Sequence, residues 1–137
     1  MSESITGGCQ CGAVRFECTE EPMFAAHCQC TNCQKFSGTG HASNLMVPKS
    51  ALTVTGDVST YDYDADSGNI MTRAFCPKCG SPVYGTSKNN PDGVMLRAGT
   101  LDDTSRFQPK AVLFTSSAAD WDDVDGDLMS FEGMPVR

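Results

Sequence analysis

Apolar and polar residues alternate in many short runs along this chain, a pattern typical of strands that bury one face. Val14, Phe16 and Cys18, for example, share one face of such a run, and charged residues occupy the other. Residues 31–36 alone look like a helical turn. The pattern therefore predicts a mainly β fold. The expected strands are 13–18, 23–27, 43–47, 52–55, 60–63, 70–75, 83–86, 94–98 and 111–114.

Most of the 13 glycines and 7 prolines lie between these runs, as expected for the turns between short strands. The sequence shows no internal repeat and no linker, so we expect a single domain over residues 1–137. Residues 116–137 are poor in apolar side chains and acidic. We interpret them as a solvated tail that Trp121 and Phe131 pin to the body; a calcium site is the alternative, but the closing Glu of an EF-hand is missing. The acidic residues are Asp120, Asp122, Asp123, Asp125, Asp127 and Glu132.

Hydrophobic content, net charge and the lengths of the apolar runs limit the kinds of protein that this chain can be. The chain has 137 residues, of which 39% are hydrophobic, which is enough to bury a core. The net charge of −7 disfavours nucleic-acid binding, which needs a positive surface. No apolar run is long enough to span a membrane, and the first residues lack the pattern of a signal peptide. We therefore expect a cytoplasmic protein with no membrane or nucleic-acid partner.

The eight cysteines are the most informative feature of the sequence. They are bunched in C-x-C, C-x-C-x-x-C and C-x-x-C patterns, whereas the cysteines of disulfide frameworks are usually spread out. In a reducing compartment disulfides rarely persist, so bunched thiols favour a soft metal ion such as zinc. The cysteines are Cys9, Cys11, Cys18, Cys28, Cys30, Cys33, Cys76 and Cys79.

Two of these groups together supply the four ligands that a structural zinc site requires. Cys76 and Cys79 form a C-x-x-C turn followed by Gly80, which is typical of a zinc knuckle. The natural partner pair is Cys9 and Cys11, a C-x-C motif flanked by glycines. We expect these four thiolates to join an N-terminal hairpin to the middle of the chain. A redox-active Cys76–Cys79 pair is the rival interpretation, but the βαβ context that it needs is absent.

The third group, Cys28, Cys30 and Cys33, offers three thiols and no obvious fourth ligand. Three protein ligands with one open position are typical of a catalytic zinc. Three thiolates make the metal electron-rich, which favours thiol chemistry over hydrolysis. The alternative is a closed site completed by Cys18 or His27. Cys18 is more consistent with a small buried residue, and His27 should point away from Cys28 across the strand.

These motifs together resemble the glutathione-dependent formaldehyde-activating enzyme family, which also includes the domain of centromere protein V. The resemblance rests on three segments over roughly residues 5–115. Gln34 stands in this chain where the family often has Arg, and the acidic segment 116–137 is not part of the resemblance. The matching segments are residues 8–16 (GCQCGAVRF), 27–38 (HCQCTNCQKFSG) and 75–80 (FCPKCG).

The resemblance implies one β-rich fold of short twisted antiparallel sheets, like that of small zinc-binding exchange-factor chaperones. It implies carbon–sulfur lyase activity, in which a thiol such as glutathione adds to formaldehyde or a related small aldehyde, and the reverse. Zinc is the expected cofactor at two sites, and the occupancy of the second site is not predicted. The resemblance assigns the structural zinc to Cys9, Cys11, Cys76 and Cys79, and the catalytic zinc to Cys28, Cys30 and Cys33.

Glutathione is an anion and this chain is acidic, so its binding requires a local basic pocket, for which Lys35, Arg73 and Arg97 are the candidates. His27 and Lys35 lie close in sequence to the cysteines and are candidates for the acid that protonates the product oxygen. The alternative function is a non-catalytic zinc-binding module that binds a protein or a small ligand, because a fold does not fix a function. The oligomeric state is not predicted.

Overall fold

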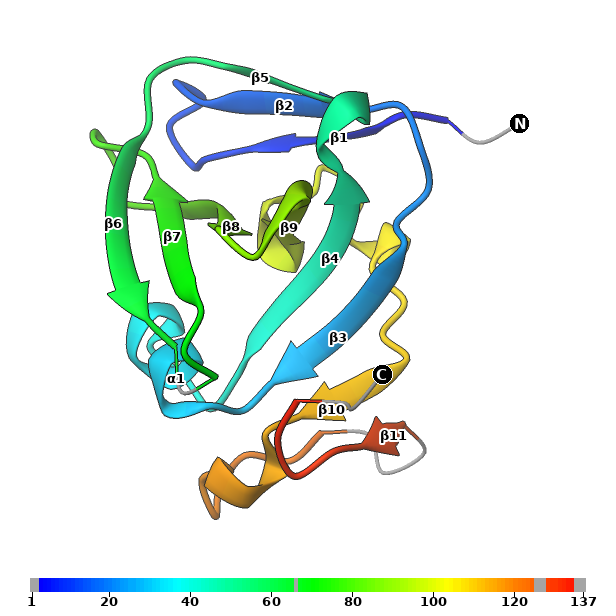
Figure 1. Ribbon diagram of the computed structural model, residues 1–137. Coiled ribbons are helices and arrows are strands. Elements are labelled where there is room, and N and C mark those ends of the chain that lie inside the picture. The colour runs from blue at the N-terminus through cyan, green and yellow to red at the C-terminus, as the bar shows by residue number, and fades with distance from the viewer. Residues whose placement is uncertain (1–2, 66, 125–127, 135–137) are drawn as a thin grey trace.

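The computed structural model describes residues 3–65, 67–124 and 128–134, and within them the chain is mainly β with one short α-helix (Figure 1). The helix α1 spans Thr31–Ser37. The strands are β1 (Ile5–Gly8), β2 (Arg15–Cys18), β3 (Phe24–Cys28), β4 (Ala42–Pro48), β5 (Leu52–Thr55), β6 (Ser59–Asp64), β7 (Ile70–Phe75), β8 (Pro82–Ser87), β9 (Asn90–Arg97), β10 (Ala111–Leu113) and β11 (Met129–Ser130).

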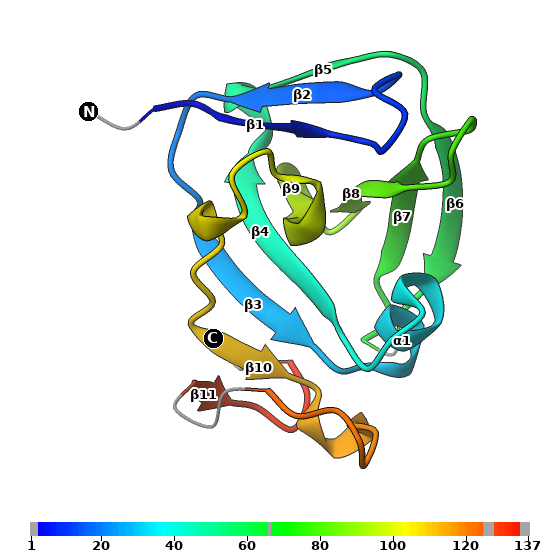
Figure 2. The same cartoon turned by 180° about the vertical axis from the view of Figure 1, so that it is seen from behind.

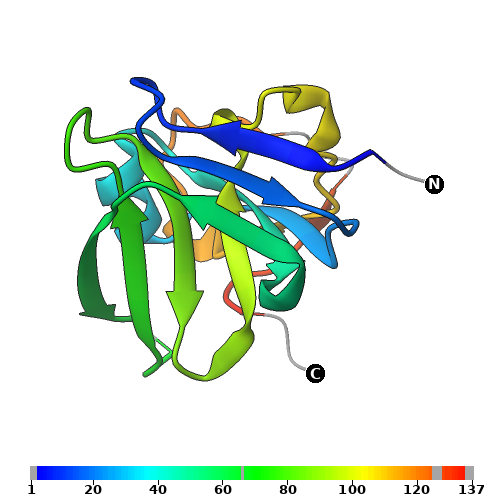
Figure 3. The ribbon, with the colours of Figure 1, turned by 90° about the horizontal axis from the view of Figure 1, so that it is seen from above.

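The described strands form two sheets. The small sheet has the order β1-β2-β5, and the large sheet has the order β11-β10-β3-β4-β9-β8-β7-β6. The small sheet lies across one end of the large one, and α1 lies at the opposite end, beside β6 and β7 (Figures 1 and 2). Viewed from above, β1, β2 and β5 form a layer of their own (Figure 3).

Strand β10 departs from the expected antiparallel pairing, because it lies parallel to both β3 and β11. Strand β9 already runs in the same direction as β3, since each is antiparallel to β4. Residues 98–110 then carry the chain back before β10 begins, so β10 also runs along β3. A parallel pair needs such a crossover connection, which local alternation of residue types does not reveal.

The main core lies between the two sheets. Val14 and Phe16 of the N-terminal hairpin pack there against Leu45 of β4 and Leu96 of β9, all of them buried. Cys18 belongs to the same cluster and is fully buried. Its predicted role as a small buried residue is therefore confirmed.

The face of the large sheet that points away from the main core carries polar residues of the candidate site. Cys28 lies directly across from Ala42, and Asn44, two residues further along β4, lies directly across from Arg97. Because side chains alternate along a strand, Cys28, Asn44 and Arg97 share one face. Phe36 of α1 packs over the same face, with its ring 4.4 Å from the Arg97 guanidinium carbon.

The C-terminal segment is attached differently from the prediction. Trp121 is 68% exposed, so the expectation that it pins the segment to the body is wrong. Asp122 makes the attachment instead, through hydrogen bonds to Gln29 and His41. Phe131 contributes through its main chain, whose N–H donates to the carbonyl of Val112. Asp125 and Asp127 lie outside the described residues.

No helix among the described residues is long and apolar enough to cross a bilayer.

Candidate metal centres and the adjoining cavity

Two turns of the same design carry the four cysteines predicted to bind structural zinc. In the first, the N–H of Gly12 donates to the carbonyl of Cys9, and in the second the N–H of Gly80 donates to that of Cys76. Both glycines have a positive φ, 82° and 78°, which a glycine adopts without strain. The first turn closes the β1–β2 hairpin and the second joins β7 to β8. The two turns therefore bring the small and the large sheet together.

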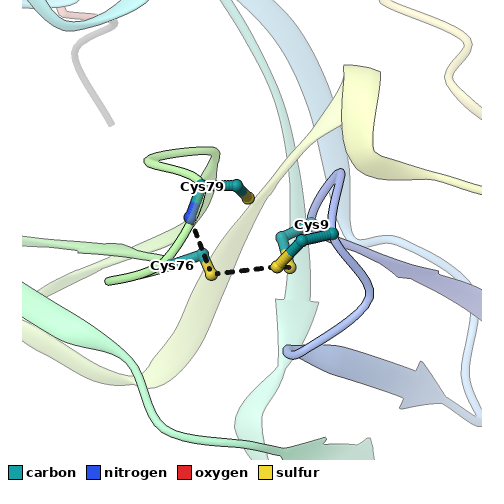
Figure 4. Close-up of side chains that lie close together, drawn as sticks. Cys9, Cys76 and Cys79 are labelled. Atoms are coloured by element: carbon teal, nitrogen blue, oxygen red, sulfur yellow. Dashed lines mark hydrogen bonds between the residues drawn. The ribbon is translucent and has the colours of Figure 1, made fainter.

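The sulfur atoms of these four cysteines converge, with all four within 4.8 Å of one another. The Cys11 sulfur lies 3.6 Å from those of both Cys9 and Cys76. Four sulfurs placed tetrahedrally about 2.3 Å from one zinc ion lie about 3.8 Å apart. In Figure 4 the side chains of Cys9, Cys76 and Cys79 point toward one another from the two turns. The donor set and its spacing fit a zinc ion.

Local hydrogen bonds favour the thiolate form of Cys79. At Cys11 a hydrogen bond from the backbone of Ala13 lowers the pKa, but the side chain of Cys9 and burial outweigh it and raise the pKa to about 11. The sulfur of Cys79 lies 3.2 Å from the Ser81 hydroxyl, which lowers the pKa of Cys79 to about 5. The N–H groups of Lys78 and Cys79 donate to the sulfur of Cys76, at 3.4 and 3.5 Å. Thiolates are the form that binds zinc, so the turn prepares its cysteines for a metal.

The second group of cysteines comes from the junction of β3 and α1. Cys28 ends β3, Cys30 caps the N-terminus of α1, and Cys33 lies in the first turn of that helix. Their three sulfurs lie within 4.8 Å of one another. The N–H of Cys33 donates to the Cys30 sulfur at 3.2 Å. Hydrogen bonds from Cys28 and Cys33 lower the pKa of Cys30 to about 3, and the bond to Cys30 raises the pKa of Cys28 to about 11.

Among the described residues, no fourth metal-ligating side chain joins the three-cysteine group. Cys18 lies in the main core. His27 faces away from Cys28, as predicted, and its Nδ1 lies 2.8 Å from the Ser43 hydroxyl. Its position on the opposite side of β3 also separates it from the cavity described next. The described residues therefore bring three candidate metal ligands together at this group.

A cavity of about 590 Å³ extends from α1 to the zinc-knuckle turn. None of the three cysteines lines it, but Phe36, which packs against them, does. All three candidate cations, Lys35, Arg73 and Arg97, line it. The ring of Phe36 lies between the two guanidinium groups, 4.9 Å from that of Arg73 and 4.4 Å from that of Arg97. The residues lining the cavity are Asn32, Lys35, Phe36, Tyr61, Arg73, Ala74, Phe75, Gly80, Pro82 and Arg97.

The two arginines are held in place by their surroundings. Arg97 is only 8% exposed, and its Nη1 donates to Asn44 Oδ1 at 2.7 Å. Burial lowers the pKa of Arg97, and the nearby thiols of Cys33 and Cys28 partly oppose that shift. Among the described residues, the Nε atoms of Arg73 and Arg97 are buried and have no hydrogen-bond partner. Both guanidinium groups also lie over aromatic rings, Arg73 over Tyr63 and Arg97 over Phe36, each at 4.4 Å. The cavity lining thus carries fixed positive charge that can attract an anionic ligand.

Asn44, which orients the Arg97 guanidinium, was not predicted from the sequence. Nothing in the local sequence marks Asn44, because its role follows from the register that places it opposite Arg97. Gln34 was noted only for its departure from the family pattern. Its side-chain amide donates to the carbonyls of Gln29 and Ser117, both at 2.9 Å, so it holds the cysteine loop.

The chain also matches a known protein family. The family described as "Glutathione-dependent formaldehyde-activating enzyme" matches residues 4–117, which include both cysteine groups and all three cavity cations. The chain belongs to this family. A crystal structure of a Rhodobacter sphaeroides protein from structural genomics matches with a TM-score of 0.56 at 22% identity, over 71% of this chain and 87% of that one. At that identity the likeness concerns the fold alone.

Proposed function

We propose that this protein is a zinc-dependent carbon–sulfur lyase that adds an anionic thiol, glutathione or a close relative, to formaldehyde or another small aldehyde, and catalyses the reverse. One observation carries the proposal. Phe36 packs against the three-cysteine group and lines a cavity that is also lined by three cations. A module without catalytic activity would not need an open metal position beside an anion-binding cavity.

We assign the structural zinc to Cys9, Cys11, Cys76 and Cys79, and the catalytic zinc to Cys28, Cys30 and Cys33. The spacing of the sulfurs supports both assignments. Zinc bound at the second group would lower the pKa of an added thiol, so that the thiol is nucleophilic at neutral pH. All eight cysteines are free thiols in the structure, which is consistent with the reducing, cytoplasmic location that we also propose.

The cavity gives the anionic thiol its binding site. Arg73 and Arg97 line the cavity and can pair with a carboxylate, and Lys35 adds a third positive charge. The apolar ring of Phe36 lies between the guanidinium groups and also packs against the three-cysteine group. A thiol whose carboxylates bind these cations is thereby placed with its sulfur near the cysteines.

The reaction requires little beyond placement and charge stabilisation. A bond forms between the sulfur of the thiol and the carbonyl carbon, and in net the thiol proton moves to the carbonyl oxygen. No atom is oxidised or reduced, and the reverse reaction breaks the same bond. The N–H groups of the cavity cations can stabilise the developing oxyanion, and the ammonium of Lys35 can also supply its proton. His27 does not fit this role, because it lies on the opposite side of β3.

Replacement of one cysteine tests the proposal. We expect Cys30→Ser to lose most of its thiol–aldehyde addition, measured as formation of S-hydroxymethylglutathione, while circular dichroism shows an unchanged fold. The matched control is Cys18→Ala, which removes a thiol that belongs to neither group and should retain activity. Unchanged turnover in a folded Cys30→Ser protein would remove this group from the mechanism and favour the non-catalytic zinc module.

A further inference from the structure

The loop that carries the three-cysteine group is held by a segment that lies partly beyond the family match. Gln29, between Cys28 and Cys30, is only 3% exposed, and its N–H donates to the carbonyl of Leu113 at 2.9 Å. Its side-chain amide donates to Asp122 Oδ2 at 2.9 Å. Asp122 lies beyond residue 117, where the family match ends.

Gln34 connects the same two parts of the chain. Its amide nitrogen donates to the carbonyl of Gln29 and to that of Ser117, each at 2.9 Å. The cysteine loop is therefore tied to residues 113–122, here named the clamp segment, by main-chain and side-chain hydrogen bonds. Three separate positions of the clamp segment contribute: Leu113, Ser117 and Asp122.

Within the clamp segment, Asp122 has a buried side chain that is fixed by hydrogen bonds. Its side chain is 7% exposed, and both of its oxygens lie 3.0 Å from Nδ1 of His41. Gly40 leaves the necessary space, because a Cβ atom at that position would overlap the Asp122 side chain. Burial opposes ionisation of Asp122, but the hydrogen bonds from Gln29 and His41 give it a lowered pKa overall. Asp122 is therefore a buried carboxylate that accepts hydrogen bonds from two side chains and packs against a glycine.

We propose that Asp122 is a positioning residue for the metal ion of the three-cysteine group. The inference rests on the proposed function. Asp122 fixes the side chain of Gln29, and Gln29 lies between two of the ligands, so the carboxylate holds the spacing of Cys28 and Cys30. Residues that orient metal ligands typically change metal affinity about 10- to 100-fold when they are removed. The four-cysteine site shares none of these contacts and provides an internal reference.

Chelator competition on the zinc-loaded protein measures the affinity of each site separately. We expect Asp122→Ala to weaken zinc binding at the three-cysteine group about 10- to 100-fold and to leave the four-cysteine site unchanged. Asp122→Asn should give an intermediate loss, because its one amide oxygen can accept from only part of the donor pair. Asp123→Asn, the same charge change at an exposed neighbour, is the matched control and should behave as wild type.

Gly40→Ala tests the same contact from the other side without changing charge. The new methyl group displaces Asp122, so the variant should show the same site-selective loss even if Asp122→Ala does not fold. Wild-type affinity at both sites in Asp122→Asn and Gly40→Ala would overturn the inference, and so would an equal loss at both sites. A wild-type protein that binds only one zinc ion would instead contradict the proposed function on which the inference rests.

Discussion

At the scale of single residues, the local charge of the cavity matters more for binding an anion than the net charge of the chain. The protein carries a net charge of −7, yet three cations line one cavity. Arg97 is nine-tenths buried, and its one side-chain hydrogen bond among the described residues is to the neutral oxygen of Asn44. A local positive potential in a low-dielectric cavity attracts an anion even when the whole molecule is acidic. The account therefore requires that these arginines act in substrate binding.

Arg73→Gln tests that requirement. A hydrogen bond between charged groups contributes about 1.5–3 kcal/mol, so the KM for glutathione should rise about 10- to 100-fold. The kcat should change much less, and an uncharged thiol should be affected little. Steady-state kinetics of thiol–aldehyde addition with both thiols measures this.

The matched control is Arg106→Gln, which removes the same charge from a side chain that lies outside the cavity and pairs with the exposed Glu21. Its KM should stay within about twofold of wild type, since an exposed ion pair contributes little. Equal effects of the two substitutions would show that general charge, and not the cavity, governs binding.

Residue types and spacing were enough to predict much of the candidate site. The spacing of the cysteines predicted which four and which three sulfurs meet, and the structure brings both groups together. The three candidates for anion binding, Lys35, Arg73 and Arg97, line one cavity, and their role in binding stays a prediction. Asn44 and Asp122 could not be found in this way, because their roles follow from partners 53 and 93 residues away along the chain.

At the scale of the element, the two turns that carry the four-cysteine group depend on glycines with positive φ, Gly12 and Gly80. Gly80 has a φ of 78°, and a Cβ atom built there would meet no other atom within 4 Å. Any destabilisation by a side chain at this position therefore comes from the backbone conformation alone. The left-handed conformation costs a residue other than glycine about 1–2 kcal/mol.

Gly80→Ala should accordingly lower the free energy of unfolding of the zinc-loaded protein by about 1–2 kcal/mol. Gly99→Ala is the matched control, because Gly99 has equally open surroundings but no positive φ. That substitution should be neutral or slightly stabilising. Urea denaturation followed by circular dichroism measures both, and equal stabilities of the two variants would contradict the assignment of this turn.

Elements were predicted well where their signal is local. Alternation identified β5 and β7 with the bounds that the structure gives them. Strand β1, with two glycines among its four residues, has too weak a pattern, and it forms because β2 pairs with it. The parallel pairing of β10 also escaped prediction, because the direction of a strand depends on the connection that precedes it.

At the scale of the whole molecule, the four-cysteine site joins the two sheets. Cys9 and Cys11 come from the hairpin of the small sheet, and Cys76 and Cys79 come from the β7–β8 turn of the large one. A metal ion that links residues so far apart in sequence contributes directly to folding. The three-cysteine group lies within residues 28–33, so a metal bound there would contribute less to the fold.

Stepwise removal of zinc should separate these two roles. A chelator should extract zinc from the open three-cysteine site first, with loss of activity and little change in circular dichroism. Zinc should leave the four-cysteine site later, together with cooperative loss of β structure. Cys30→Ser should show only the second step, and release of both ions in one step would contradict the division of roles.

The open metal position is tested most directly by ¹¹³Cd NMR of the protein loaded with cadmium in place of zinc, because each site then gives its own resonance. The account predicts two resonances in the wild type, of which one is missing in Cys30→Ser. Titration with glutathione should shift that resonance alone, as a fourth sulfur joins Cys28, Cys30 and Cys33. A single resonance in the wild type, or a second resonance that does not respond to glutathione, would contradict the account.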